Sequence, residues 1–382
     1  MNVGELLQTA QTRTGLADFG PADFMEGLTL LVDGINREAE IRDNSWEQVR
    51  ARLLRLLMNR LWFAKDLADH PEMQRENLGL SLIIVSLPRT GTTKLQRLLG
   101  ASDDFQVHRW WQEHMFARIP GLDEGGKARR IAETRECEQW MYDTSPAILT
   151  GHPTFTDEPD EDIWLMEATF RHEFIFGLFD SPSYVQWAVQ ADLQPAFDYL
   201  FSQLKYLQWQ SASPKLKPWL LKGPNHMGKE KYLMPMFEKP RFIVTHRDPC
   251  KCLPSVTATA MAMRKLYSDR DGSAMISAGV VNLFVKLLHE HMAWRDSHAD
   301  VPILDLSFRE INEDGVATAK KVYDFLDMPL SRAAEDGMRN WEQNNRREKH
   351  PKSNYSAEGI GTTDAAIREA CKPYIDRYAE FF

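Results

Sequence analysis

Residues 81–99 read Ser81-Leu-Ile-Ile-Val-Ser-Leu-Pro-Arg-Thr-Gly-Thr-Thr-Lys-Leu-Gln-Arg-Leu-Leu99. The stretch opens with the apolar run of a buried strand, turns through Gly91 and continues in a helical pattern. A helix beginning at Thr92 or Thr93 directs unpaired backbone N–H groups and the positive end of its dipole at an anion on the turn. Gly91 lets the backbone approach that anion, and Arg89 supplies a positive charge. We therefore expect a phosphate-like ligand at this turn.

The turn differs from the Walker A loop of nucleoside triphosphatases. That loop needs Gly, four residues and then Gly-Lys-Ser/Thr, whereas Ser86 stands at the first glycine position and Thr92 replaces the lysine. A kinase of a small metabolite is therefore a weaker alternative, since it also needs an aspartate for Mg²⁺. An NAD-binding oxidoreductase needs Gly-x-Gly-x-x-Gly, which residues 88–93 do not supply. The purely structural alternative is a solvated loop whose threonines cap the helix.

A second strand end carries complementary chemistry. Residues 241–255 read Arg-Phe-Ile-Val-Thr-His-Arg-Asp-Pro-Cys-Lys-Cys-Leu-Pro-Ser, with a buried-type strand that ends near Thr245. Ligands of open α/β sheets bind at the carboxyl ends of the strands. Arg247 can direct two N–H groups at a phosphate, and Ser255, eight residues on, can add a hydroxyl. The structural alternative is an ion pair between Arg247 and the neighbouring Asp248.

Together the two motifs resemble those of the sulfotransferase superfamily, whose sulfuryl donor is 3′-phosphoadenosine 5′-phosphosulfate (PAPS). Pro-Arg-Thr-Gly-Thr-Thr at residues 88–93 looks like the family's 5′-phosphosulfate loop, and Arg247 with Ser255 looks like its 3′-phosphate motif. The form Pro-Arg-x-Gly-Thr-Thr is similar to the branch that contains bacterial sulfotransferases and the tyrosylprotein sulfotransferases. The resemblance extends from about Leu80 to Phe382.

Three further segments support this resemblance. Trp219-Leu-Leu-Lys-Gly-Pro224 resembles the strand whose lysine touches the sulfuryl bridge, Asp305-Leu-Ser-Phe-Arg-Glu310 resembles a late strand, and Lys349-His-Pro-Lys-Ser-Asn-Tyr355 resembles the basic closing loop. The resemblance implies PAPS as donor, adenosine 3′,5′-bisphosphate (PAP) as product, and no metal. Lys222 and Arg89 are implied in the chemical step. The implied donor site consists of Arg89, Thr90, Gly91, Thr92, Thr93, Arg247, Ser255, Lys349 and Lys352.

The base that takes the acceptor's proton has three candidates. His152 precedes Pro153, which favours an extended or turn backbone, and histidine can accept a proton near neutral pH. Its structural alternative is a histidine with all its hydrogen bonds satisfied. Glu113 is the rival, because a Glu at about this distance is the base of the tyrosylprotein enzymes; its alternative is a residue that faces solvent. Glu161 is a more distant third candidate.

The acidic run around Pro159 has a simpler interpretation. Carboxylates favour the first turn of a helix, and we expect a helix that runs from this region to Phe179. Most of this charge is therefore interpreted as helix N-terminal and solvated. The residues concerned are Asp157, Glu158, Asp160, Glu161 and Asp162.

Composition limits the remaining classes. The chain has 382 residues, of which 43% are hydrophobic, and a net charge of −9. It can bury a substantial core, while its acidic balance argues against nucleic acid or an anionic membrane as partner. No run of about 18 apolar residues appears, and the first residues lack signal-peptide features, so we expect a cytoplasmic location. Four irregularly spaced cysteines predict reduced thiols and no zinc site.

The alternation of strands and helices predicts an α/β fold, with a mostly parallel central sheet flanked by helices, as in P-loop-like sulfotransferases. We expect a helical annex at residues 1–78 and the sulfotransferase domain at 79–382. Expected strands lie at 81–87, near 105–108, and at 218–222, 241–245 and 302–306. Expected helices lie at 24–39, 46–67, 127–142, 194–210, 229–237, 255–266, 275–297, 315–326 and 331–346.

Aromatic residues concentrate between Trp110 and Trp187. They are typical of an apolar ligand pocket and equally of a helix core, and Phe170, Phe174 and Phe176 favour the core. With the resemblance, they predict a small, hydrophobic alcohol or phenol as acceptor, and an amine is also compatible. The sequence leaves open the identity of the acceptor, the oligomeric state, and a non-catalytic scaffold that binds PAP.

Overall fold

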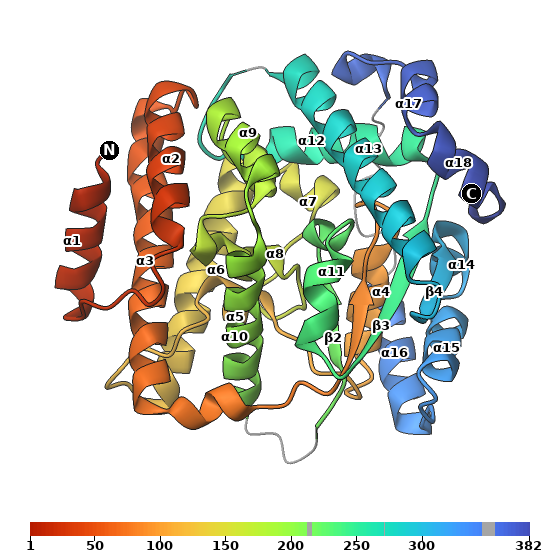
Figure 1. Cartoon of the computed structure of the whole chain (residues 1–382), viewed down its shortest axis with the longest axis horizontal. Helices are drawn as coiled ribbons and strands as arrows, with labels where there is room; N and C mark the ends of the chain where they lie inside the picture. The colour runs from red at the N-terminus through yellow and green to blue at the C-terminus, as the bar shows by residue number, and fades with distance from the viewer. Residues whose placement is uncertain (212–215, 271, 346–355) are drawn as a thin grey trace.

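A parallel sheet of four strands forms the centre of the molecule (Figure 1). The computed structural model describes residues 1–211, 216–270, 272–345 and 356–382. Within them the strands β1 (Leu80–Ile84), β2 (Trp219–Lys222), β3 (Lys239–His246) and β4 (Ile303–Ser307) lie in the order β2-β1-β3-β4. The predicted α/β fold class is therefore confirmed.

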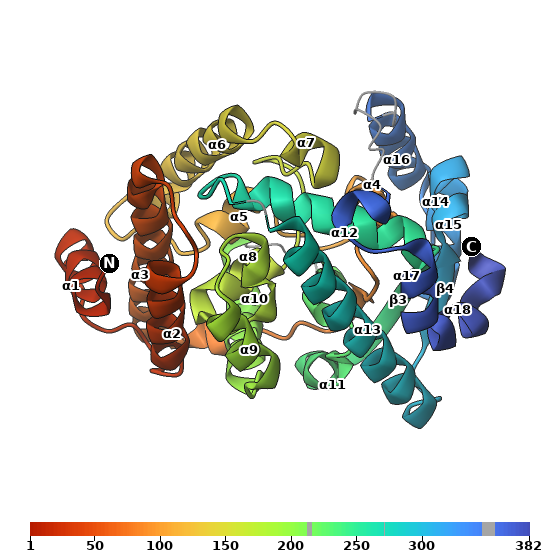
Figure 2. The same cartoon turned by 90° about the horizontal axis from the view of Figure 1, so that it is seen from above.

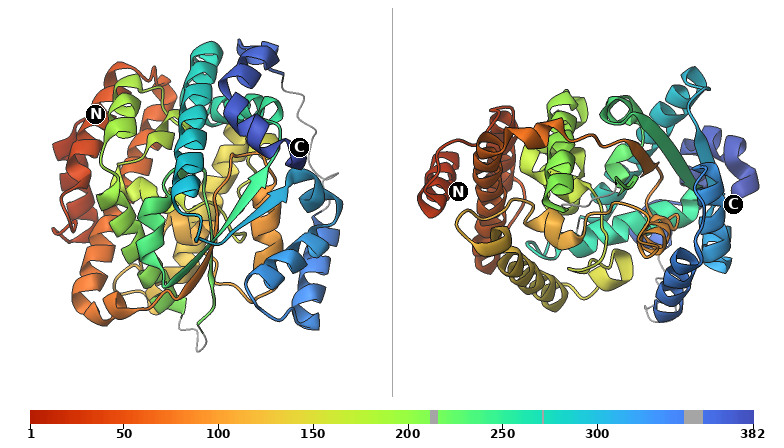
Figure 3. Two further views of the ribbon diagram at one scale, coloured as in Figure 1. Left: turned by 45° about the vertical axis from the view of Figure 1, so that its right-hand side comes forward. Right: turned by 90° about the horizontal axis from the view of Figure 1, so that it is seen from below.

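Alternating apolar side chains explain why helices cover both faces of this sheet (Figure 3). Leu82 and Ile84 belong to one buried cluster, together with residues of α4 (Thr92–Gly100) and α15 (Gly315–Phe325). Ile83 belongs to a second, larger cluster on the other face. Successive side chains of a strand point to opposite faces, and a parallel sheet buried on both faces needs apolar residues at every position.

The strand register brings the candidate site together. Ile84, the last residue of β1, lies beside Lys222 of β2 and beside Ile243 of β3. Parallel strands end at the same edge of a sheet, so the loops that follow β1, β2 and β3 start next to one another. Arg89 and Arg247 lie in the loops after β1 and β3, and Lys222 is the last residue of β2.

Three N-terminal helices form a layer at one side of the molecule, far from the C-terminus (Figures 1 and 2). They are α1 (Val3–Thr14), α2 (Phe24–Arg37) and α3 (Trp46–Asp69). The helices expected at 24–39 and 46–67 are confirmed, whereas α1 was not predicted. Their buried side chains share one cluster with those of α10 (Gln194–Ser211). The boundary at residue 78 stays a prediction.

The later predicted helices are present, with shifted ends: besides α10 and α15 they are α6 (Lys127–Thr144), α11 (Glu230–Leu233), α12 (Pro249–Arg264), α13 (Ser273–Ser297) and α16 (Arg332–Asn344). The helices α9 (Pro182–Gln190), α14 (Phe308–Glu313), α17 (Asp364–Ala370) and α18 (Lys372–Tyr378) were not predicted. α12 begins six residues earlier than expected, because Pro249 suits the first helical turn and Asp248 accepts a hydrogen bond from the Cys250 amide at 2.9 Å. Within the described ranges, no helix has the length and apolar character needed to cross a membrane.

Two expected elements are wrong. Residues 105–108 form no strand; Gln106 makes only an isolated bridge to Trp219. The single helix expected up to Phe179 is also absent. A short α8 (Ile163–Met166) and two 3-10 turns, Glu167–Thr169 and Glu173–Gly177, take its place. Phe170 stands between these turns with φ of 51°, a left-handed conformation that ends a right-handed helix.

Candidate functional site

The turn after β1 has the geometry of an anion cradle. Gly91 adopts φ of 92°, and α4 begins at Thr92 with no side chain capping its first N–H groups. A Cβ at Gly91 would lie 3.4 Å from the side chains of Phe308 and Ile311. That distance is an ordinary van der Waals contact, so glycine is favoured here by the backbone conformation and not by lack of space. The start of α4 presents N–H groups and a positive dipole end to the loop.

The hydroxyl groups of Thr90 and Ser86 connect this turn to β3 by hydrogen bonds. The Thr90 hydroxyl lies 2.6 Å from the Leu87 carbonyl oxygen and 2.6 Å from the Thr245 hydroxyl. The Ser86 hydroxyl accepts a hydrogen bond from the Thr245 amide at 2.7 Å. Since the Thr90 side chain is buried in these contacts, only its backbone remains for the donor site implied by the sequence.

The two sequence motifs meet at Arg89. Its Nε donates to the Ser255 hydroxyl at 3.0 Å, and its Nη1 donates to the Gly151 carbonyl. Arg247 donates from Nη1 to the Arg89 carbonyl oxygen at 2.8 Å, although the two residues are 158 positions apart. The Arg247 guanidinium also lies over the Phe308 ring, 4.0 Å from its centroid. Phe308 was not among the predicted site residues, because a cation–π contact leaves no spacing pattern in the sequence.

Lys222 connects β2 to the start of α4. Its side chain is 2% exposed, and its Nζ lies 2.9 Å from Glu161 Oε1 and 3.4 Å from the Thr93 hydroxyl. The structure thus brings the Lys222 ammonium group to the first turn of α4. Arg89 lies in the turn that precedes this helix, and Ser255 and Gly151 hold its guanidinium group.

His152 lies just beyond α7 (Ile148–Gly151) and beside the acidic run. Its Nε2 is 2.8 Å from Asp160 Oδ1, and its Nδ1 is 3.8 Å from Glu161 Oε1. Burial on its own would raise the pKa of Asp160, but His152, Lys222 and Arg97 together hold this pKa below its ordinary value. Asp160 is therefore an ionised partner for the His152 ring.

Glu113 belongs to α5 (Trp110–His114) and is 1% exposed, so the alternative that it faces solvent is wrong. Its Oε1 lies 2.6 Å from His108 Nδ1. Burial raises the pKa of Glu113 to about 8, with His108 acting in the opposite direction.

The interpretation of the acidic run as solvated helix charge is also wrong for two of its members. Asp160 and Asp162 are fully buried, and both pair with histidines. Asp162 contacts His108 and His226, neither of which was predicted as a site residue. The only signal in the sequence was that His226 follows Lys222 by four positions.

Most aromatic residues between 110 and 187 belong to the core, as one of the two interpretations expected. Trp110, Phe116, Phe170, Phe179 and Tyr184 are at most 3% exposed. Phe155 is an exception, since it is only half-buried and packs in neither of the two core clusters; it lies three residues after His152. The implied donor residues Lys349 and Lys352 lie outside the described residues.

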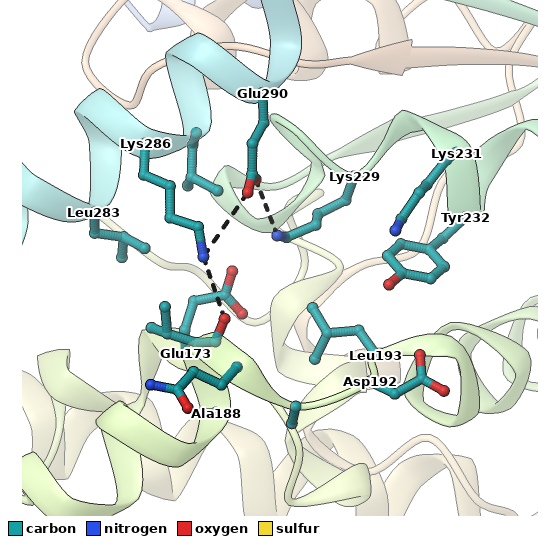
Figure 4. A pocket seen from close by; sticks show the side chains of 14 residues that line it. Glu173, Ala188, Asp192, Leu193, Lys229, Lys231, Tyr232, Leu283, Lys286 and Glu290 are labelled. Atoms are coloured by element: carbon teal, nitrogen blue, oxygen red, sulfur yellow. Dashed lines mark hydrogen bonds and ion pairs between the residues drawn. The ribbon is translucent and has the colours of Figure 1, made fainter. Parts of the chain in front are cut away.

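A pocket of about 340 Å³ lies elsewhere, between α9, α11 and α13 (Figure 4). Lys229 and Lys286 converge on Glu290, with N–O distances of 3.3 and 3.8 Å. Lys231 and Glu173 also line it. Because these charges compensate one another and no expected site residue lines this pocket, we do not assign the donor site to it. In the described part of the chain, no group of three or more His, Cys, Asp or Glu side chains has a metal-holding arrangement.

A family model described as the sulfotransferase family matches residues 81–332, a range that contains the turn, Lys222, Arg247 and Ser255. The chain belongs to the sulfotransferase family. This sulfotransferase is similar in structure to STF9 from Mycobacterium avium, with a TM-score of 0.84 and 22% identity over 99% of this chain and 96% of that chain. STF1 from Mycobacterium tuberculosis H37Rv gives a TM-score of 0.80 and 23% identity, over 97% of this chain and 98% of that chain. At this identity the two likenesses show the fold. No curated protein sequence matches.

Proposed function

We propose that this sulfotransferase moves a sulfuryl group from PAPS to a hydroxyl or amine of a small acceptor and releases PAP. The convergence of Arg247 and Ser255 on Arg89, in the turn that precedes α4, carries the proposal. Guanidinium groups bind phosphate through two parallel N–H groups, and helix N-termini favour anions. In this proposal Arg247 and Ser255 bind the 3′-phosphate, and the Gly91 turn binds the 5′-phosphosulfate.

The residues present suit such a donor. Arg89, Lys222 and Arg247 bring three positive charges to the edge of the sheet, while the left-handed Gly91 keeps side-chain atoms off the turn. We assign to Lys222 and Arg89 the stabilisation of charge that develops on the sulfuryl group and the departing phosphate. Positioning and fixed charge dominate the related phosphoryl transfers as well.

We assign the base to His152. A proton on Nε2, facing Asp160, leaves the Nδ1 lone pair to take the acceptor's proton. An aspartate also orients the histidine of hydrolase triads, although there it binds Nδ1 and Nε2 is the base. In the step, the acceptor O–H bond breaks and its oxygen bonds to sulfur. The bond from sulfur to the phosphate oxygen breaks, and that oxygen keeps the electron pair. Glu161 already pairs with Lys222, and Glu113 is buried and pairs with His108, so neither is our choice of base.

A hydrophobic alcohol or phenol remains our proposed acceptor class. The half-buried Phe155 lies near His152, and its ring centroid is 6.2 Å from that of Tyr142. A mass-spectrometric screen of alcohols, phenols, amines and sugars with PAPS tests this class. Sulfation of sugars alone would contradict it. The cytoplasmic location also stays a proposal.

Calorimetry with PAP tests the donor site. Arg247→Ala should weaken PAP binding by roughly 1.5–3 kcal/mol, the usual contribution of hydrogen bonds to charged groups. Arg309→Ala is the matched control, because Arg309 follows Phe308 directly but is exposed. Equal PAP affinity in wild type and Arg247→Ala would remove the 3′-phosphate assignment. PAP binding without turnover of any acceptor would favour a scaffold, and phosphorylation with ATP would favour a kinase.

A further inference from the structure

Behind the candidate site lie four titratable residues that the proposed mechanism does not use. His108, Glu113, Asp162 and His226 come from three separate segments, since His108 and Glu113 are five positions apart, and none is more than 1% exposed. They form a continuous chain of contacts. His226 Nε2 contacts Asp162 Oδ2, Asp162 Oδ1 contacts His108 Nε2, and His108 Nδ1 lies 2.6 Å from Glu113 Oε1.

Two members of this chain, Asp162 and His108, are charged at neutral pH. Burial on its own would lower the pKa of His108, but Asp162 and Glu113 raise it to about 10. Burial on its own would raise the pKa of Asp162, but His108 and His226 hold it at about 2. An ionised Asp162 therefore faces a protonated His108. A lone buried carboxylate is unfavourable, so two partners on separate segments hold Asp162 at one point.

Asp162 is also joined directly to the candidate site. Its amide donates to the Lys222 carbonyl oxygen at 3.1 Å. The three consecutive acidic residues spread in three directions from this point. Asp160 faces His152, Glu161 faces Lys222, and Asp162 faces the two buried histidines. The backbone that presents Asp160 and Glu161 is thus held by Asp162.

We propose that Asp162 is a positioning residue, clamped by His108 and His226 so that Asp160 orients His152 and Glu161 holds Lys222. The inference rests on the proposed function, in which His152 is the base and Lys222 acts on the sulfuryl group. Asp162 itself does not contact substrate, because it is fully buried. Displacements of about 1 Å in a catalytic constellation cost up to roughly 10²-fold in rate.

The Asp162→Asn variant tests the clamp. Asparagine keeps the shape but has no negative charge and one acceptor oxygen, so it cannot accept from both histidines. We expect turnover at saturating PAPS to fall about 10–100-fold, with PAP affinity changed less than about threefold. In ¹⁵N-histidine NMR spectra, the His152 ring signals, assigned with His152→Gln, should move. Normal turnover with unmoved His152 signals would overturn the proposal.

Glu230→Gln is the matched control. Glu230 and His291 form another buried pair, each 1% exposed and 2.6 Å apart, which joins α11 to α13. We expect Glu230→Gln to lower the melting temperature but to leave turnover and the His152 signals unchanged. A loss of turnover equal to that of Asp162→Asn would show that general destabilisation causes both effects, and would overturn the proposal.

A second variant covers the case in which Asp162→Asn does not fold. His226→Gln keeps an N–H donor for Asp162 but removes the ring, so we expect a smaller change in turnover and in the His152 signals. Unchanged values would overturn the proposal. If wild-type protein transfers no sulfuryl group at all, the proposed function fails, and the His152 signals still decide whether Asp162 positions that ring.

Discussion

At the scale of single residues, Lys222 tests where charge develops in the reaction. Lys222→Met removes the ammonium group that lies beside Thr93 and keeps much of the buried side-chain volume. We expect turnover to fall on the order of 10²–10³-fold, with a smaller loss of PAP affinity, because the charge acts mainly in the transition state. Steady-state kinetics at saturating PAPS and calorimetry with PAP measure the two effects. Near-normal turnover would show that Lys222 has a structural role and does not stabilise the transition state.

His152 and Glu113 are separated by a pair of substitutions. We expect His152→Ala to lower turnover by roughly 10²–10⁴-fold with almost unchanged PAP affinity, since it removes a general base and leaves the donor site intact. Glu113→Gln should have a modest effect. The reverse pattern would transfer the role of base to Glu113.

At the scale of secondary-structure elements, the β1–α4 turn depends on one backbone conformation. Gly91→Ala places a side chain at φ of 92° and a Cβ 3.4 Å from Phe308. We expect a loss of about 1–2 kcal/mol of stability and weaker PAP binding. Gly177→Ala is the control, because no atom lies within 4 Å of its added Cβ. Urea unfolding measures the stability of the two variants, and calorimetry measures their PAP affinity. Equal effects would contradict a particular need for glycine at position 91.

The same turn shows which parts of the structure a sequence can reveal. The apolar run before Gly91 and the spacing from Arg247 to Ser255 are local patterns, and both led to elements that the structure contains. Asp162 and His226 meet across 64 positions, and nothing in the acidic run distinguishes the inward carboxylates from the exposed Asp157. Contacts of this kind depend on how distant segments of the chain pack together. The roles of Asp162 and His226 could therefore be inferred only from the structure.

At the scale of the whole molecule, Glu113 gives a pH dependence of stability. Its pKa is about 8 in the folded chain and 4.5 ordinarily, so the folded state binds the proton more tightly. This contribution is fully present below pH 4.5 and is lost as the pH rises through about 8.

Glutamine at position 113 cannot ionise. We therefore expect the stability of Glu113→Gln relative to wild type to increase from pH 5 to pH 8, by at most about 1.4 kcal/mol per pH unit. Urea unfolding of both proteins at about pH 5.5, 6.5 and 8 measures this difference. A constant difference over this range would contradict a buried, protonated Glu113.

The strand order has a consequence for how the chain is made. β1 lies inside the sheet, but both of its partner strands come much later in the chain. Ser81 pairs with Trp219 on one side, and Leu80 pairs with Lys239 on the other. A ribosome that adds about 5–20 residues per second leaves both edges of β1 unpaired for roughly 7–27 s before either partner strand exists. Such an edge is a template for association with other nascent chains. Productive synthesis of this protein therefore depends on what shields one five-residue strand while the rest of the sheet is still being translated.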